Sequence, residues 1–167
     1  MWLWQTWMYK VEGILIWQTT YWTSPAAFPN SLQNPYEDPM SYVSGYGRPP
    51  GYIGYWGNGD GRFLYPPKKV FQSDEECLEG PVSSIRWEML REGVEDYEYL
   101  WTLRDEIERM KSKGLSEDEK TLVEKAQKLL EVPTEICASM TDFSRDPKPI
   151  FERRLEIARM IERLKGR

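Results

Sequence analysis

The 167-residue chain has no histidine and only two cysteines, Cys77 and Cys137. Without histidine, it cannot form the Ser-His-Asp and Cys-His nucleophile systems or histidine-containing zinc sites, and it lacks the commonest general base near neutral pH. The two cysteines lie far apart in the sequence and allow at most one disulfide, so we expect buried free thiols. The sequence therefore predicts no metal site and no cofactor.

The chain also lacks an excess of basic residues, because its formal net charge is −5. Nucleic-acid binders normally present a basic face, so no nucleic-acid partner is expected. The aromatic stretch over residues 1–22 is interrupted by polar residues, unlike a signal peptide or a membrane span of about 20 apolar residues. We expect a cytoplasmic chain without membrane contact. Its abrupt aromatic start leaves open that it is the tail of a longer polypeptide.

Composition divides the chain near residue 80. Residues 1–80 hold 17 of the 23 aromatic residues and 9 of the 12 glycines, whereas the remainder is charged and has helical periodicity. The sequence predicts a helix over 2–11 that ends at Gly13, followed by a buried parallel strand over 13–17. An aromatic Gly/Pro-rich loop over 23–67 comes next and contains a turn at 58–61 and a strand at 62–65. Three helices follow, over 84–111, 116–131 and 146–166. Inside the helix over 84–111, Gly93 marks close packing or a kink.

The first candidate site follows the predicted strand over 13–17, at its carboxyl end. In α/β folds ligands bind at this end of parallel strands. The residues there are Trp17, Gln18, Tyr21 and Trp22. Aromatic faces suit the apolar faces of sugar rings, and amide and hydroxyl groups suit their hydroxyls. Alternatively, the two tryptophans belong to the core.

Two further groups are candidates for the same site. Asp60 lies in a glycine-rich turn that is followed by Tyr65 and lacks the lysine of a phosphate loop. A turn in which Asp60 bonds its own backbone explains the same residues. Arg86 opens the helix over 84–111, where we expect it to face the strand ends or to pair with Asp60 or another loop acid. Glu95 and Asp96 point about 100° apart on a helix, which favours a structural role for both.

Three motifs in this order resemble the C-terminal part of glycoside hydrolase family 123, whose members are β-N-acetylgalactosaminidase-like enzymes. The first is Gly-Ile-Leu-Ile-Trp at 13–17 with Tyr-Trp-Thr at 21–23, and the second is Gly-Asp-Gly-Arg-Phe-Leu-Tyr-Pro at 59–66. The third, over residues 81–100, is the most specific. The helical stretch over 146–158 extends the resemblance to the whole chain.

The resemblance implies an α/β fold in which the chain is the C-terminal portion of a TIM (β/α)8-type barrel. Residues 1–111 would supply about two β/α units with the loop over 23–67 and a last barrel helix over 84–111. Residues 112–167 would form a C-terminal helical extension. The implied activity is hydrolysis of a terminal N-acetylhexosamine by substrate assistance, in which the 2-acetamido oxygen attacks the anomeric carbon.

The family's adjacent Asp-Glu pair orients the acetamide and protonates the leaving oxygen, and the resemblance places it on an earlier barrel strand. The acidic pairs at 37–38, 74–75 and 95–96 are in the wrong order or place, so we assign no catalytic residue. The chain is expected to supply part of a wall that binds an amino-sugar glycan. We expect it not to hydrolyse glycosides alone, and to self-associate or combine with an upstream polypeptide that completes the barrel.

A second hypothesis is a non-catalytic module that binds glycans through its aromatic loop or docks on another subunit. Upstream coding sequence for the missing strands and an Asp-Glu pair would favour the enzyme, and its absence would favour the module.

Overall fold

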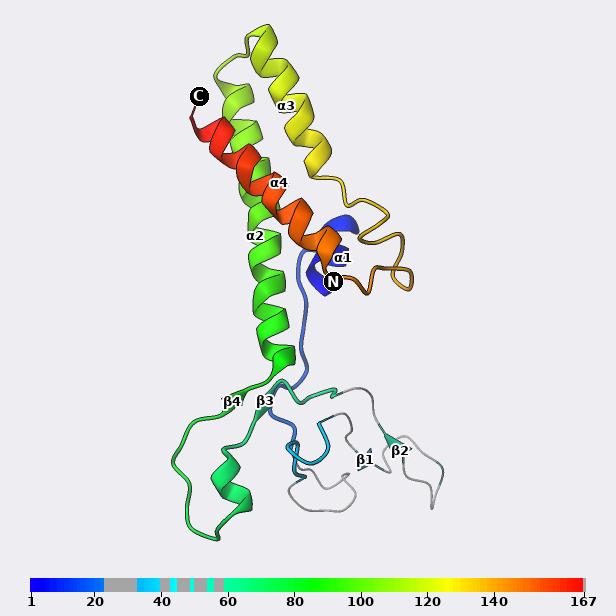
Figure 1. Ribbon diagram of the computed structural model, residues 1–167, viewed down its shortest axis with the longest axis vertical. Helices are drawn as coiled ribbons and strands as arrows, with labels where there is room; N and C mark the ends of the chain where they lie inside the picture. Colours follow the sequence, from blue (N-terminus) through cyan, green and yellow to red (C-terminus); the bar gives the residue numbers. More distant parts are fainter. Residues whose placement is uncertain (23–32, 40–42, 45–48, 50–53, 56–58, 167) are drawn as a thin grey trace. The chain divides into compact units, whose positions relative to one another are not determined.

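The computed structural model describes residues 1–22, 33–39, 43–44, 49, 54–55 and 59–166 (Figure 1). The rest of the predicted loop over 23–67, including Asn58 of the predicted turn, lies outside the described residues. The chain divides into a helical unit, made of residues 1–14 and those from 90 onwards, and a loop unit, made of residues 15–89. The helix α2 (Ile85–Ser112) begins in the loop unit, and its residues from 90 onwards belong to the helical unit.

The helical unit contains α1 (Trp2–Met8), most of α2, α3 (Glu117–Leu129) and α4 (Lys148–Lys165). The helices predicted over 84–111, 116–131 and 146–166 are therefore confirmed to within about two residues at each end. A capping box begins α3: the Ser116 N–H donates to Glu119 Oε2 (2.9 Å), and the Ser116 hydroxyl accepts from the Glu119 N–H (3.4 Å). It satisfies two backbone donors that a helix N-terminus otherwise leaves unpaired.

Apolar side chains at helical spacing form the core of the helical unit. Figure 1 shows α3 beside the C-terminal part of α2, and α4 crossing α2 obliquely. The buried residues that they share with α1 and the α3–α4 connection are Trp4, Leu100, Leu103, Ile107, Met110, Leu122, Val123, Ala126, Ile136, Cys137, Ile157, Met160, Ile161 and Leu164. Both cysteines are free thiols, as predicted, but only Cys137 is buried and Cys77 is half-buried. Among the described residues no helix combines the length and the hydropathy that crossing a bilayer requires.

Close packing explains Gly93. A Cβ built at this position would lie 3.0 Å from Leu3 Cδ2, closer than ordinary van der Waals contact. The absence of a side chain on α2 therefore lets α1 approach it directly, which confirms the packing alternative for this glycine.

The helix α1 ends in a Schellman motif whose left-handed residue is Lys10, so the predicted stop at Gly13 is wrong. The Lys10 N–H donates to the Trp7 carbonyl (3.1 Å) and the Val11 N–H to the Thr6 carbonyl (3.0 Å), while the φ angle of Lys10 is 55°. Glycine usually takes this position, because a side chain strains the left-handed backbone. The local hydrogen bonds hold a lysine in a conformation that it disfavours.

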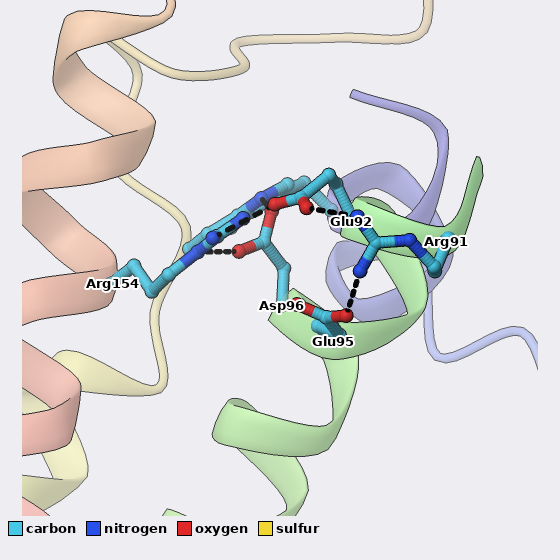
Figure 2. Close-up of polar contacts among 6 residues, drawn as sticks. Arg91, Glu92, Glu95, Asp96 and Arg154 are labelled. Atoms are coloured by element: carbon cyan, nitrogen blue, oxygen red, sulfur yellow. Dashed lines mark hydrogen bonds and ion pairs between the residues drawn. The ribbon is translucent and has the colours of Figure 1, made fainter. Parts of the chain in front are cut away.

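A buried carboxylate joins three helices of the helical unit (Figure 2). Asp96 on α2 accepts a hydrogen bond from the Trp4 indole (2.8 Å) through Oδ2 and another from Arg154 Nε of α4 through Oδ1. Arg154 also donates to Glu92 Oε2 (3.0 Å). The neighbouring Glu95 is exposed and pairs with Arg91 on the same helix. The structural role predicted for Glu95 and Asp96 is confirmed.

These contacts shift the pKa values of Glu92 and Arg154. The hydrogen bond from Arg154 holds the pKa of the Glu92 carboxyl below its ordinary value, against the opposing effect of partial burial. Burial lowers the pKa of Arg154, but its hydrogen bonds to Asp96 and Glu92 outweigh burial and raise it. The ionised forms of these groups are therefore the ones that the fold stabilises.

The loop unit contains little regular structure among its described residues. β1 (Val43–Ser44) pairs antiparallel with β2 (Gly54–Tyr55), β3 (Leu64–Tyr65) pairs antiparallel with β4 (Val82–Ser83), and a 3₁₀ turn covers Lys68–Phe71. The strand predicted over 62–65 is confirmed in β3. The expected portion of a (β/α)8-type barrel stays a prediction.

The strand predicted over residues 13–17 is wrong. These residues are irregular, and the Leu15 side chain is 82% exposed. A strand that is apolar on both faces is stable only when neighbouring strands pair with it and other elements cover its faces. Among the described residues no strand pairs with this segment.

The Asp96 contacts predict a stability effect for Asp96→Asn. The amide keeps the size of the side chain and an acceptor for Trp4, but it removes the charge that compensates Arg154. We expect the free energy of unfolding to fall by about 1.5–3 kcal/mol, the range for hydrogen bonds to charged groups. Urea denaturation measures this change. The control Glu95→Gln removes an exposed ion pair and should cost less than about 1 kcal/mol, and equal losses in both variants would contradict the role of Asp96.

The lowered pKa of Glu92 predicts a pH dependence of stability. A carboxyl whose pKa is lower in the folded state stabilises the fold above its unfolded pKa, and this contribution is lost as the pH falls through its folded pKa. From about pH 5 towards about pH 3, the wild type should therefore lose more stability than Glu92→Gln. Glu98→Gln, which removes an exposed carboxylate of the same helix, should behave like the wild type. Parallel curves for wild type and Glu92→Gln in urea denaturation would contradict this linkage.

Candidate functional site

Backbone hydrogen bonds bring two of the sequence motifs together in the loop unit. The Tyr21 N–H donates to the Gly61 carbonyl (2.8 Å), and the N–H groups of Phe63 and Leu64 donate to the Thr19 carbonyl (3.0 Å each). The segment over residues 17–22 therefore runs antiparallel beside residues 59–64. Side chains from motifs about 40 positions apart in the sequence consequently project from adjacent backbone.

The turn at Gly59, Asp60 and Gly61 shapes this region. It is closed by the Arg62 N–H, which donates to the Gly59 carbonyl (2.9 Å), and both glycines have left-handed φ angles of 70° and 74°. A Cβ at Gly59 would lie 2.0 Å from Arg86 Cζ, and one at Gly61 would lie 2.8 Å from Tyr21 Cβ. Each glycine thus provides both the turn conformation and the space for a candidate site residue.

On one side of the turn, Trp17, Tyr21 and Asp60 form an aromatic–acid cluster. The Trp17 indole N–H donates to Asp60 Oδ1 (3.0 Å), and the Trp17 and Tyr21 rings meet edge to face with centroids 4.8 Å apart. Trp17 is 46% exposed, so the alternative that it belongs to the core is wrong. Asp60 bonds the indole, in place of the backbone bond considered for it. The three predicted residues form one surface.

On the other side of the turn, Arg86 lies in the first turn of α2. The Ser84 hydroxyl accepts hydrogen bonds from the Arg86 N–H (3.2 Å) and the Trp87 N–H (3.4 Å), so Ser84 caps the N-terminus of α2. The Arg86 guanidinium donates to the Tyr65 hydroxyl (3.4 Å) and the Pro39 carbonyl (2.8 Å). Arg86 therefore faces the end of β3, as expected.

Tyr36 extends this side of the site, although the sequence did not single it out. Its ring meets the Tyr65 ring edge to face at 5.4 Å between centroids, and its hydroxyl donates to the Pro66 carbonyl (3.0 Å). Burial, with a smaller effect of Tyr65, raises the pKa of Tyr36, so the hydroxyl stays a donor. The only sequence signal was its position among the aromatic residues of the loop.

The remaining two candidates, Gln18 and Trp22, are not part of this group. The Trp22 indole donates to the Leu64 carbonyl (2.7 Å), so this tryptophan fastens the segment to β3. Gln18 is half-buried and has no hydrogen-bond partner among the described residues. The structure thus gathers Trp17, Tyr21, Asp60, Tyr65 and Arg86 around the turn and leaves Gln18 and Trp22 outside that group.

Arg62 supports the site from beneath and was not a predicted site residue. Its side chain is buried and donates to the Asp38 carbonyl (2.6 Å) and to the Gln33 side chain. These bonds hold residues 33–39, which carry Tyr36, against the turn. A buried arginine such as Arg62 has a positioning role, because its guanidinium donates to oxygen atoms of the protein itself.

Acidic groups do not gather at this site among the described residues. Glu37 and Asp38 are exposed, and Glu75 is exposed and pairs with Lys69 (3.9 Å). Within the same residues, no three acidic or cysteine side chains cluster closely enough to hold a metal ion.

The Gly61 geometry predicts that Gly61→Ala disrupts the site. A left-handed alanine costs about 1–2 kcal/mol, and its Cβ would collide with Tyr21, so the loop unit should unfold at a lower urea concentration. Tryptophan fluorescence, through Trp17, measures the transition. The matched control is Gly80→Ala, where a Cβ meets nothing within 4 Å and no loss is expected. An unchanged midpoint in Gly61→Ala would contradict the packing of Tyr21 on the turn.

The family model described as "Glycoside hydrolase 123, catalytic domain" matches residues 1–103. The matched residues include every side chain of the candidate site. No curated protein and no solved structure gives a significant match to the chain.

The match ends inside α2, so residues 104–166 lie outside it, and the extension of the resemblance to residues 146–158 has no support from this comparison. The matched region covers well over half of the 167 residues and includes the three motifs on which the resemblance was based. The chain belongs to glycoside hydrolase family 123.

Proposed function

We propose that this chain supplies part of the sugar-binding wall of a glycoside hydrolase that removes terminal N-acetylhexosamine residues by substrate assistance. The observation that carries the proposal is the grouping of Trp17, Tyr21 and Asp60 on one side of the glycine turn, with Tyr65 and Arg86 on the other. This grouping combines the exposed Trp17 ring and the half-buried Tyr21 ring with an acceptor, a hydroxyl and a cation.

Each group suits one feature of a sugar. The exposed Trp17 ring offers an apolar face to the C–H face of a pyranose, while Tyr21 fixes the ring from its edge. Asp60 Oδ1 is bonded by the indole, which leaves Oδ2 to accept from a sugar hydroxyl. Arg86 and Tyr65 contribute donors for an amide or hydroxyl oxygen of the same ligand.

The chemical step then depends on acids outside this group. A general acid must hold a proton at working pH, which requires burial or a close negative charge. Asp60 is exposed and lies beside an indole donor, so it is suited to binding and not to proton transfer. In the proposed enzyme the chain orients the sugar, and an Asp-Glu pair on an earlier strand assists the attack of the 2-acetamido oxygen.

The proposal includes the barrel. In it, an upstream polypeptide supplies the earlier strands and covers the Leu15 side chain, which is 82% exposed. Alone, the chain exposes this side chain and should associate with itself or with that polypeptide. The alternative non-catalytic module uses the same aromatic surface for binding without any such partner.

The test is a ligand-observed NMR titration with N-acetylgalactosamine. The wild type should bind, and Tyr21→Ala or Trp17→Ala should weaken binding at least about tenfold, as expected for the loss of one well-packed aromatic contact. The matched control is Tyr9→Ala, which removes a tyrosine of the helical unit that is about as exposed as Trp17. No response to the amino sugar at tens of millimolar would overturn the proposed site.

Hydrolysis is tested separately with a nitrophenyl N-acetyl-β-galactosaminide, beside size-exclusion chromatography. We expect no turnover above the buffer rate by the chain alone. Turnover by a clean monomer would show that the chain carries its own catalytic acids and would contradict the assignment of a wall without them.

A further inference from the structure

An aromatic groove lies entirely within the helical unit. It has a volume of about 690 Å3 and is formed by the end of α1, one face of α2 and the end of α3. Tyr97, Trp101 and Arg104 line it from α2, where their spacing places them on one face of the helix. Volumes of this size are typical of sites for small organic ligands. None of its lining residues belongs to the site at the glycine turn.

Arg104 is held between aromatic rings. Its Cζ lies 3.8 Å from the centroid of the Trp101 ring and 5.2 Å from that of Trp7. Trp7 is itself fixed by an edge-to-face contact with Tyr97 at 5.4 Å and by its indole, which donates to the Leu130 carbonyl (2.8 Å). The guanidinium is therefore held in place by its contacts with two indole rings.

Arg104 has no carboxylate partner among the described residues, whereas Arg91, Arg109 and Arg154 of the same unit all have one. A fixed guanidinium with unused N–H groups matches a carboxylate, which it binds through two parallel hydrogen bonds.

Lys10 adds a second cation to the groove at the cost of backbone strain. Within the described part of the chain it is the one non-glycine residue with a left-handed φ angle (55°). Strained residues persist where the surrounding structure holds them, and they concentrate at functional sites. With Glu12 as the single acid of the lining, the groove has a net positive charge.

We propose that this groove binds an acidic sugar, a pyranose that carries a carboxylate, as a second carbohydrate site without catalytic function. Arg104 pairs with the carboxylate, the ammonium of Lys10 contributes at the rim, and the half-exposed Trp101 packs against the ring. The membership of the chain in a glycoside hydrolase family favours a sugar over an acidic peptide as the ligand.

The test is a ligand-observed NMR titration of the full chain with methyl β-glucuronide, and with methyl β-glucoside as the ligand without a carboxylate. Arg104→Gln should weaken glucuronide binding at least about tenfold, as expected for a charge-assisted pair. Arg159→Gln removes an exposed cation of α4 and should leave binding unchanged. Lys10→Gly should bind glucuronide more weakly and yet unfold at the same or a higher temperature, because glycine relieves the strain.

Several results would overturn the proposal. These are no glucuronide binding at tens of millimolar, equal binding of the glucoside, an Arg104→Gln variant that binds like the wild type while folded by circular dichroism, or tighter binding of a tetraglutamate peptide. Tyr21→Ala, in the loop unit, should not affect glucuronide binding. The outcome is therefore independent of whether N-acetylgalactosamine binds at the glycine turn.

Discussion

The candidate site depends on two glycines, which have no side chain. Gly59 and Gly61 adopt left-handed angles, and the space at each is taken by another residue of the site: the Arg86 guanidinium at one and the Tyr21 side chain at the other. Any Cβ at either position would strain the backbone and also displace that neighbour. Thus the same turn that reverses the chain also sets how closely the cationic and aromatic sides approach. The chemistry of the surface follows from this spacing and not from regular secondary structure, of which the loop unit has little.

The helical unit is organised by a different constraint, the need to compensate a buried carboxylate. Asp96 accepts from Trp4 and Arg154, and this connects α1 and α4 to α2 at one point. Removing charged groups from water costs free energy that hydrogen bonds only partly recover, so such a network adds more to the specificity of the packing than to its total stability. The apolar core fixes the three long helices, whereas Asp96 determines how α1 and α4 meet α2.

The sequence predicted the helices, but not how the candidate site residues are arranged. Helical periodicity and the Ser116 cap are local signals, and α2, α3 and α4 follow them closely. The strand over 13–17 depended on pairing with distant residues, which no local pattern specifies, and there the prediction failed. Lys10 was missed because its conformation is uncommon for lysine, and Tyr36 because nothing in its neighbours distinguishes it from other loop aromatics. The Asp60–Trp17 bond likewise joins residues whose proximity is set by the backbone ladder.

Three arginines, Arg62, Arg154 and Arg104, have different roles because their surroundings differ. Arg62 is buried and satisfies protein carbonyls, so it positions residues 33–39. Arg154 is paired with two carboxylates, so its charge is compensated within the fold. Arg104 lies over two indole rings and has no carboxylate partner among the described residues. An arginine that is held by aromatic rings keeps its N–H groups available as donors to an anionic ligand. In this respect Arg104 differs from Arg62 and Arg154, whose N–H groups bond the protein.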